Sequence, residues 1–143
     1  MLNLVYDKVN NLRHARHCVF ALHIHLVFVT KYRKHLFTQK TRLALKEIFR
    51  AVCTQFEAEL VEFDGESDHV HLLVNYPPKI AFSKLVNALK GVSSPLLRKA
   101  HPEIASKYWK GVLWSPSYFA ASCGGALISI IKQYIENQKM PTD

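Results

Sequence analysis

Cysteine is scarce in this sequence, and long apolar runs are missing. Three cysteines, at positions 18, 53 and 123, make an odd count with no two close together in the 143 residues. This argues against a disulfide framework and a cysteine-based zinc site, and it fits a reducing cytoplasm. Apolar stretches break well before the roughly 20 residues of a membrane span, and no export leader is visible. We therefore expect one cytoplasmic domain over residues 1–143, without a membrane partner.

Negative charge is scarce outside one short segment. Residues 57–68 hold 6 of the 11 acidic residues and no Lys or Arg, which leaves the remainder with 19 positive and 5 negative charges. Such an excess attracts polyanions, above all nucleic acid, and would bring the protein to the nucleoid when it acts. A basic protein that is merely soluble is the alternative. Apolar residues make up 49% and charged residues 21% of the chain, which indicates a globular domain.

Hydrophobic periodicity predicts an α+β domain. We expect a basic, flexible arm over residues 1–17 and a helix over residues 126–140 at the other end. Between them the pattern predicts strands at 18–30, 60–66, 70–76, 111–114 and 118–122, and helices at 38–56, from 83 onward and briefly after 102. A kink or interruption is expected at Pro95. This order indicates a ferredoxin-like (split βαβ) antiparallel sheet with helices packed on it.

Two His-x-His pairs could each present two imidazoles from one face of a strand. His69 and His71 directly follow the acidic segment, whose charge favours a cation, and imidazole is a common ligand of divalent metals. Two histidines are too few for a complete site, and ordinary hydrogen bonds on a half-buried strand are the alternative. His23 and His25 precede a basic cluster instead, so we interpret them as structural or DNA-contacting.

The last predicted helix carries Tyr134 and Gln138, which stand one turn apart on the same face. A tyrosine beside an apolar stripe is usually a core residue, but a tyrosine can also be a covalent nucleophile. Basic and aromatic side chains are candidates for phosphate binding and base stacking, and solvated loops with the aromatic rings turned into the core are the alternative. The predicted DNA-binding residues are Lys31, Tyr32, Arg33, Lys34, Lys90, Lys110 and Trp114.

Several segments together resemble one family, the single-tyrosine HUH transposases of the insertion sequence 200/605 type. They occur in the family's order and spacing from about residue 18 to the end of the chain. The matching segments are residues 25–33 (HLVFVTKYR), 68–74 (DHVHLLV), Pro77-Pro78, 89–91, 108–109, 113–115, 118–119 and 134–138 (YIENQ).

The resemblance implies a mechanism. His69 and His71 would bind Mg²⁺ or Mn²⁺ with Gln138 as third protein ligand, and Tyr134 would attack the scissile phosphate. Members of this family cut and rejoin single-stranded DNA near hairpins through a 5′-phosphotyrosine. They act as homodimers in which the tyrosine helix of one subunit can complete the metal site of the other. A non-catalytic binder of hairpin nucleic acid and a metal-dependent nuclease that uses water remain the alternatives.

Overall fold

The computed structural model describes residues 13–15, 18–20, 22–107, 111–122 and 128–138. Its centre is a four-stranded sheet in the order β4-β5-β3-β6, and every neighbouring pair is antiparallel. The strands are β3 (His23–Val29), β4 (Glu59–Gly65), β5 (His69–Asn75) and β6 (Phe119–Ser122). Helix α2 (Gln39–Gln55) connects β3 to β4, and helix α3 (Phe82–Ala100) connects β5 to β6. This is the ferredoxin-like α+β arrangement that the sequence predicts.

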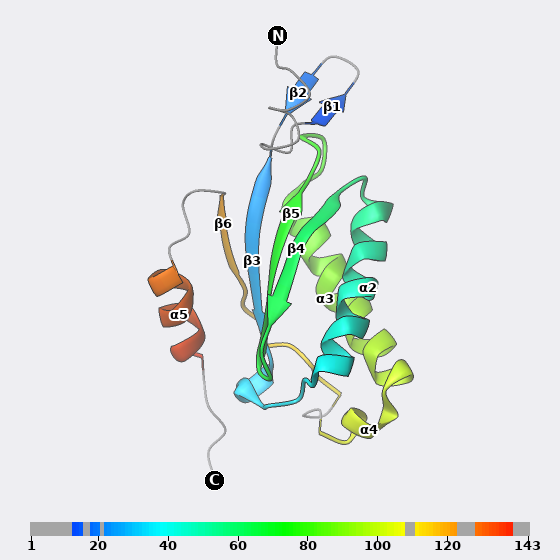
Figure 1. Cartoon of the computed structure of the whole chain (residues 1–143), viewed down its shortest axis with the longest axis vertical. Coiled ribbons are helices and arrows are strands. Elements are labelled where there is room, and N and C mark those ends of the chain that lie inside the picture. The colour runs from blue at the N-terminus through cyan, green and yellow to red at the C-terminus, as the bar shows by residue number, and fades with distance from the viewer. Residues whose placement is uncertain (1–12, 16–17, 21, 108–110, 123–127, 139–143) are drawn as a thin grey trace.

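One face of the sheet is apolar and covered by α2 and α3 (Figure 1). Alternate side chains of the two central strands point to this face, and they are buried together with the apolar stripes of both helices. The buried residues are Ile24, Leu26 and Phe28 of β3, Val70, Leu72 and Val74 of β5, Leu45, Phe49 and Val52 of α2, and Leu85, Leu89 and Leu97 of α3. This core fixes the register of the central strands, because a one-residue slip would expose their apolar side chains.

The opposite face carries polar side chains and is the side on which helix α5 (Ile128–Glu136) lies, next to β6 and away from α2 and α3 (Figure 1). His69 and His71 of β5 belong to this face because their neighbours Val70 and Leu72 point into the core. None of the helices in the described ranges is long and apolar enough to cross a membrane.

The N-terminal region differs from the prediction. Strand β1 (Arg13–Ala15) lies within the expected flexible arm and pairs with β2 (Cys18–Phe20) in a separate two-stranded sheet. The long strand expected over residues 18–30 is therefore divided into β2 and β3. The reason is that β2 pairs with β1, whereas β3 pairs with β5 and β6. Residues 1–12 of the expected arm lie outside the described residues.

Two further expectations need correction. Helix α3 continues through Pro95, so the expected kink does not end it, and buried Leu89 and Leu97 anchor it on both sides of the proline. The strand expected over residues 111–114 is reduced to isolated bridge residues at Val112 and Trp114, of which Trp114 pairs with Thr30. Other elements match the predictions: Thr38 caps α2, and the short helix α4 (Pro102–Ala105) begins at Pro102. The described part of the last predicted helix is α5, and Gln138 lies two residues beyond it.

Candidate active site

The β4–β5 hairpin presents the first histidine pair. A Cβ added at Gly65 would lie 2.6 Å from the carbonyl oxygen of His69, so only glycine permits this close approach of the two strands. His69 and His71 then stand half-buried on the same face of β5, as their spacing predicts. The hairpin therefore delivers two imidazoles from a strand that is paired on both sides.

Asp68 and Arg33 hold the first of these histidines. The Nδ1 atom of His69 lies 2.9 Å from Oδ1 of Asp68, and the Nε atom of Arg33 donates to Oδ2 of Asp68 at 3.4 Å. Burial alone would raise the pKa of Asp68, but the neighbouring His69 and Arg33 outweigh it and lower the pKa below its usual value. Asp68 is therefore a carboxylate that fixes the ring of His69 and leaves its Nε2 atom facing away from this contact.

The donor atoms at this end of β5 suit a divalent metal. In the described residues, one group of three potential ligands has its ligand atoms within 4.8 Å of one another, and it consists of Glu66, Asp68 and His69. Imidazole nitrogen and carboxylate oxygen are common ligands of such ions. His71 is not a member of this group, although it lies on the same face two residues further along the strand. The acidic segment thus supplies carboxylates directly beside the histidines, as its position in the sequence suggests.

His71 contacts the second histidine pair. Its Nε2 atom lies 3.0 Å from Nδ1 of His25 on the neighbouring strand, and the two rings stack with centroids 5.2 Å apart. Burial, followed by the proximity of His25, lowers the pKa of His71 and keeps it neutral at physiological pH. Sequence reasoning assigned His25 a structural or DNA-contacting role, and it missed the contact because this depends on the register of β3 against β5.

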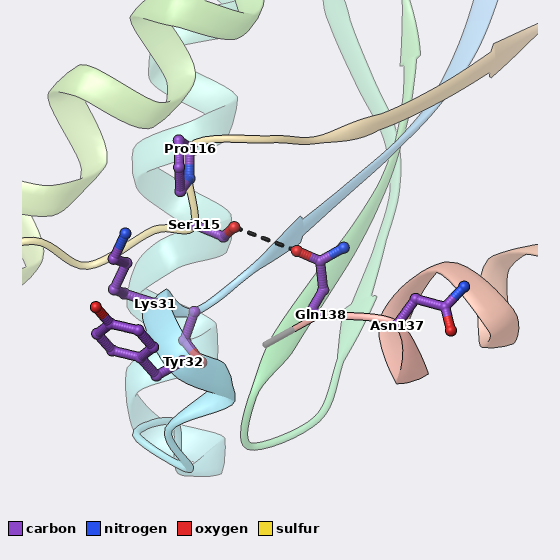
Figure 2. Close-up of a pocket in the computed structure, with 7 residues that line it drawn as sticks. Lys31, Tyr32, Ser115, Pro116, Asn137 and Gln138 are labelled. Atoms are coloured by element: carbon purple, nitrogen blue, oxygen red, sulfur yellow. Dashed lines mark hydrogen bonds between the residues drawn. The ribbon is translucent and has the colours of Figure 1, made fainter. Parts of the chain in front are cut away.

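Tyr134 and Gln138 are held by the loop that precedes β6. The Tyr134 hydroxyl lies 2.8 Å from Oγ of Ser117, and the Tyr134 ring packs on Phe119 with centroids 5.6 Å apart. Oε1 of Gln138 accepts hydrogen bonds from Ser115 at 3.2 Å and Ser117 at 3.3 Å, as Figure 2 shows for Ser115. Burial raises the pKa of Tyr134, and the Ser117 hydrogen bond offsets part of this rise. The phenol is therefore protonated in this docked position.

Lys90 holds the same loop from the other side. Its Nζ atom donates to the carbonyl oxygens of Ser115, Pro116 and Ser117 at 2.7, 3.2 and 3.2 Å. Burial lowers the pKa of this half-buried lysine. Lys90, one of the predicted DNA contacts, therefore contacts the loop that holds Tyr134 and Gln138 in this structure.

The strand register relates the two parts of the site. Phe119 of β6 pairs with Val27 of β3, and Val27 pairs with His71 of β5, so all three lie at one level on one face. Tyr134 packs on Phe119 and is thus at the level of His71, with β3 between them. Strands β5 and β6 are two strand spacings apart, or about 10 Å. This separation between the backbones of the histidine strand and the Phe119 strand exceeds hydrogen-bonding distance.

The basic loop after β3, residues 31–34, lies beside both the histidine part and the tyrosine part of the site. Tyr32 and Arg33 have φ angles of 61° and 54°, a left-handed conformation that is unfavourable for residues with side chains. Arg33 turns to Asp68, whereas Lys31 and Tyr32 line a pocket of about 280 Å³ with Ser115, Pro116, Asn137 and Gln138 (Figure 2). The ammonium of Lys34 donates to the carbonyl oxygen of Lys107.

The predicted base-stacking role of Trp114 is not supported. Its ring is 5% exposed, packs against Phe28, Phe37 and Phe49, and donates from Nε1 to Ser93 at 2.9 Å. A ring enclosed in the core cannot stack on a base, and the aromatic character of the residue alone could not reveal this. Lys110, another predicted DNA contact, lies outside the described residues.

Known proteins resemble this chain over most of its length. The family model described as "Transposase IS200 like" matches residues 18–138. The ISDra2 transposase TnpA of Deinococcus radiodurans is 34% identical over 127 residues, which cover 89% of this chain and 91% of the relative. The transposase of insertion sequence element IS200 from Salmonella typhimurium is 32% identical over 119 residues, covering 81% of this chain and 78% of the relative.

Solved structures give the same result. The crystal structure of a Deinococcus radiodurans transposase matches with a TM-score of 0.83 and 36% identity, covering 90% of this chain and 99% of the other. A REP-associated tyrosine transposase, bound to a REP hairpin in its own structure, has a TM-score of 0.54 at 12% identity, covering 87% of this chain and 68% of the other; this likeness concerns the fold alone. The fold, the family model and the relatives agree, and the chain belongs to the IS200-like transposase family.

Proposed function

We propose that this transposase cleaves and rejoins single-stranded DNA at the hairpin-marked ends of its element through a 5′-phosphotyrosine on Tyr134. One observation carries the proposal: Tyr134 and the histidine pair share one face of the sheet, and the residue on which Tyr134 packs lies at the level of His71. A nucleophile and a potential metal site on one continuous face are what phosphoryl transfer requires.

In the proposed reaction, the Tyr134 oxygen attacks the scissile phosphorus while the bond to the 3′ oxygen breaks. The tyrosine hydroxyl loses its proton, and the departing 3′ oxygen gains one and becomes a free hydroxyl. Attack of another 3′-hydroxyl on the phosphotyrosine reverses the exchange and rejoins the strands without ATP. The raised pKa of docked Tyr134 means that proton loss requires a change in its surroundings during the reaction.

His69, His71 and Gln138 are the proposed protein ligands of Mg²⁺ or Mn²⁺, and the nearby Glu66 and Asp68 carboxylates favour a cation there. The bound ion would supply Lewis-acid polarisation of the phosphate. In the docked position Oε1 of Gln138 is engaged by two serines, so ligand binding requires that this amide leave them.

A homodimer with shared active sites fits this geometry. Strand β6, on which Tyr134 packs through Phe119, is two strand spacings, or about 10 Å, from the histidine strand β5 of its own chain. The tyrosine helix therefore has to move, or to serve the histidines of a second subunit.

Single-stranded DNA with hairpins is the proposed partner. The hairpin bound to the REP-associated relative supports this, as does the excess of positive charge outside residues 57–68. Lys31, Tyr32, Arg33, Lys34, Lys90 and Lys110 remain the proposed contacts, although Arg33 contacts Asp68 and Lys90 contacts the 115–117 loop in the described structure. Of these, Lys31 and Tyr32 line the pocket next to Gln138, where an approaching strand would meet them.

The test is covalent capture. Labelled single strands that bear hairpins are incubated with the protein and Mn²⁺, and the products are separated on a denaturing gel. We expect a protein–DNA adduct that disappears in Tyr134→Phe, while Tyr76→Phe, which removes a hydroxyl beyond the other end of β5, keeps it.

Each alternative activity has its own product. An adduct that persists in Tyr134→Phe would contradict the assignment of the nucleophile. Free 5′-phosphate without an adduct would indicate a nuclease that uses water. Binding without cleavage at any Mg²⁺ or Mn²⁺ concentration would indicate a non-catalytic hairpin-binding protein.

A further inference from the structure

We propose that His25 is a positioning residue of the metal site: it accepts a hydrogen bond from Nε2 of His71, so that His71 presents Nδ1 to the metal. The inference rests on the proposed function, because it assumes that His71 is a ligand. It gives a role to His25 of the second His-x-His pair, which the proposed reaction leaves unused.

The contact between the two rings is specific. His25 Nδ1 and His71 Nε2 are 3.0 Å apart, the rings are inclined by only 26°, and both side chains are half-buried. The residues are diagonal neighbours, because His25 pairs with Leu73 and His71 with Val27 across two central strands. Paired backbone on both sides thus keeps the rings together without help from a loop.

The hydrogen-bond chemistry decides which nitrogen remains for a metal. A neutral imidazole has one protonated nitrogen and one nitrogen with a free lone pair. If Nε2 of His71 carries the proton and donates it to His25, the lone pair of His71 is on Nδ1. In the described part of the chain, that Nδ1 atom has no hydrogen-bond partner.

The other histidine of the pair is held in a comparable way. Its Nδ1 atom contacts Asp68, which leaves Nε2 of His69 for a ligand bond. Histidines that bind metals usually donate their second ring nitrogen to a neighbouring group, which fixes the ring and the tautomer. Asp68 would serve His69 and His25 would serve His71, one partner for each histidine.

His23 provides a matched control on the same strand and face. It pairs with Asn75, two positions further from the β4–β5 turn than the Leu73 that pairs with His25. The carboxylates of Glu66 and Asp68 lie at that turn. A change at His23 therefore alters the same strand and face without removing the contact between His25 and His71.

The first test reads the tautomer directly, without metal. Long-range ¹H–¹⁵N spectra of the full chain, recorded above pH about 8 where histidines are neutral, should give the pattern of an Nε2-protonated ring for His71. His25→Leu should convert it to a mixture of tautomers, whereas His23→Leu should leave it unchanged. An Nδ1-protonated His71 in the wild type would overturn the proposal.

The second test measures Mn²⁺ affinity by titration followed with electron paramagnetic resonance. His25→Leu should weaken binding by about 10-fold, the lower end of the range for partners of metal ligands. His25→Asn should retain most of the affinity, since its Oδ1 accepts from the position of the histidine Nδ1. His23→Leu should bind as the wild type does, and melting temperatures establish that each variant is folded.

The outcomes separate the inference from the proposed function. If His71→Ala weakens Mn²⁺ binding and His25→Leu does not, the positioning role is wrong while the metal site stands. If His71→Ala itself leaves the affinity unchanged, the proposed ligand set is wrong. If His25→Asn loses as much affinity as His25→Leu, the accepted hydrogen bond is not what matters, and the inference is likewise overturned.

Discussion

The two halves of the candidate site share one sheet face but are held by different forces. The histidine half, which comprises Asp68, His69 and His71, stands at the start of a seven-residue strand that is paired on both sides. The tyrosine half, which comprises Ser115, Ser117, Tyr134 and Gln138, combines a loop with a nine-residue helix and its end. The first is part of the sheet, whereas the second is attached to its edge.

This difference indicates which half can move. A ligand on a central strand cannot shift without breaking pairing to both neighbours, and its orientation is further fixed by the ion pair of Asp68 with Arg33. Within the tyrosine half, Tyr134 and Gln138 are held by the Phe119 ring and by neutral hydrogen bonds between hydroxyls and an amide, each contributing on the order of 1 kcal/mol. DNA or a second subunit can replace contacts of that size. The fold thus places the proposed ligands on its rigid part and the proposed nucleophile on its exchangeable part.

The largest expected effect comes from removing a proposed ligand in the histidine half. His69→Ala should weaken Mn²⁺ binding by at least about 100-fold, because even partners of ligands contribute up to that amount. It should also abolish the DNA adduct. Hydrogen–deuterium exchange of residues 128–138 should remain unchanged if the halves are independent, and His23→Ala should alter none of the three measurements. Faster exchange in α5 of His69→Ala would contradict the separation.

A smaller effect is expected from the tyrosine half when its supporting loop is released. Lys90→Met keeps the apolar stem of the side chain but removes three hydrogen bonds from a charged donor to the 115–117 loop. We expect local opening of this loop and of α5 to become easier by about 2 kcal/mol, visible as faster amide exchange. Mn²⁺ affinity of the histidine half should be unaffected.

Lys84→Met is the matched control for Lys90→Met, since Lys84 is exposed on the same helix. It removes the same charge from the protein without touching the loop. Equal exchange rates in the two variants would mean that Lys90 acts through its charge alone, and the assigned contact would be wrong.

The sequence predicted the histidine half better than the tyrosine half. Alternation in β5 is sufficient to place His69 and His71 on one face, and the acidic neighbours are adjacent in sequence. The partners of these residues are not adjacent: Arg33 is 35 positions from Asp68, and His25 is 46 positions from His71. Such pairs depend on strand register and on the unusual backbone at Arg33, which no local glycine signals.

The tyrosine half depends still more on tertiary structure. Helical spacing placed Tyr134 and Gln138 together, but nothing in the sequence near Ser115 and Ser117 indicates that they contact both residues. Lys90 was predicted from its charge as a DNA contact, whereas its three partners are carbonyl oxygens about 25 residues away. Trp114 was predicted as a base-stacking residue, with burial in the core as the alternative, and it is buried. Composition identifies the type of side chain, and packing decides what it contacts.

The smallest expected effect distinguishes the docking of Tyr134, the proposed nucleophile, from its acidity. Ser117→Ala removes the hydroxyl 2.8 Å from Tyr134 and one of two serine contacts of Gln138, which should ease release of α5 by about 1 kcal/mol. Because the Ser117 hydrogen bond lowers the pKa of Tyr134 against the effect of burial, its loss should raise that pKa further while the helix stays docked.

Hydrogen–deuterium exchange of the backbone amides of residues 128–138 measures the release of α5. Alkaline titration, followed by the difference in absorbance spectrum between the protein and its Tyr134→Phe variant, measures the pKa of Tyr134. Ser115→Ala is the comparison variant, because Ser115 contacts Gln138, whereas the tyrosine hydroxyl is contacted by Ser117. It should ease release similarly and leave the Tyr134 pKa nearly unchanged. Amide exchange rates that equal those of the wild type in both serine variants would mean that the Phe119 contact holds the tyrosine half instead. The difference between a rigid and an exchangeable half would then rest on packing and not on hydrogen bonds.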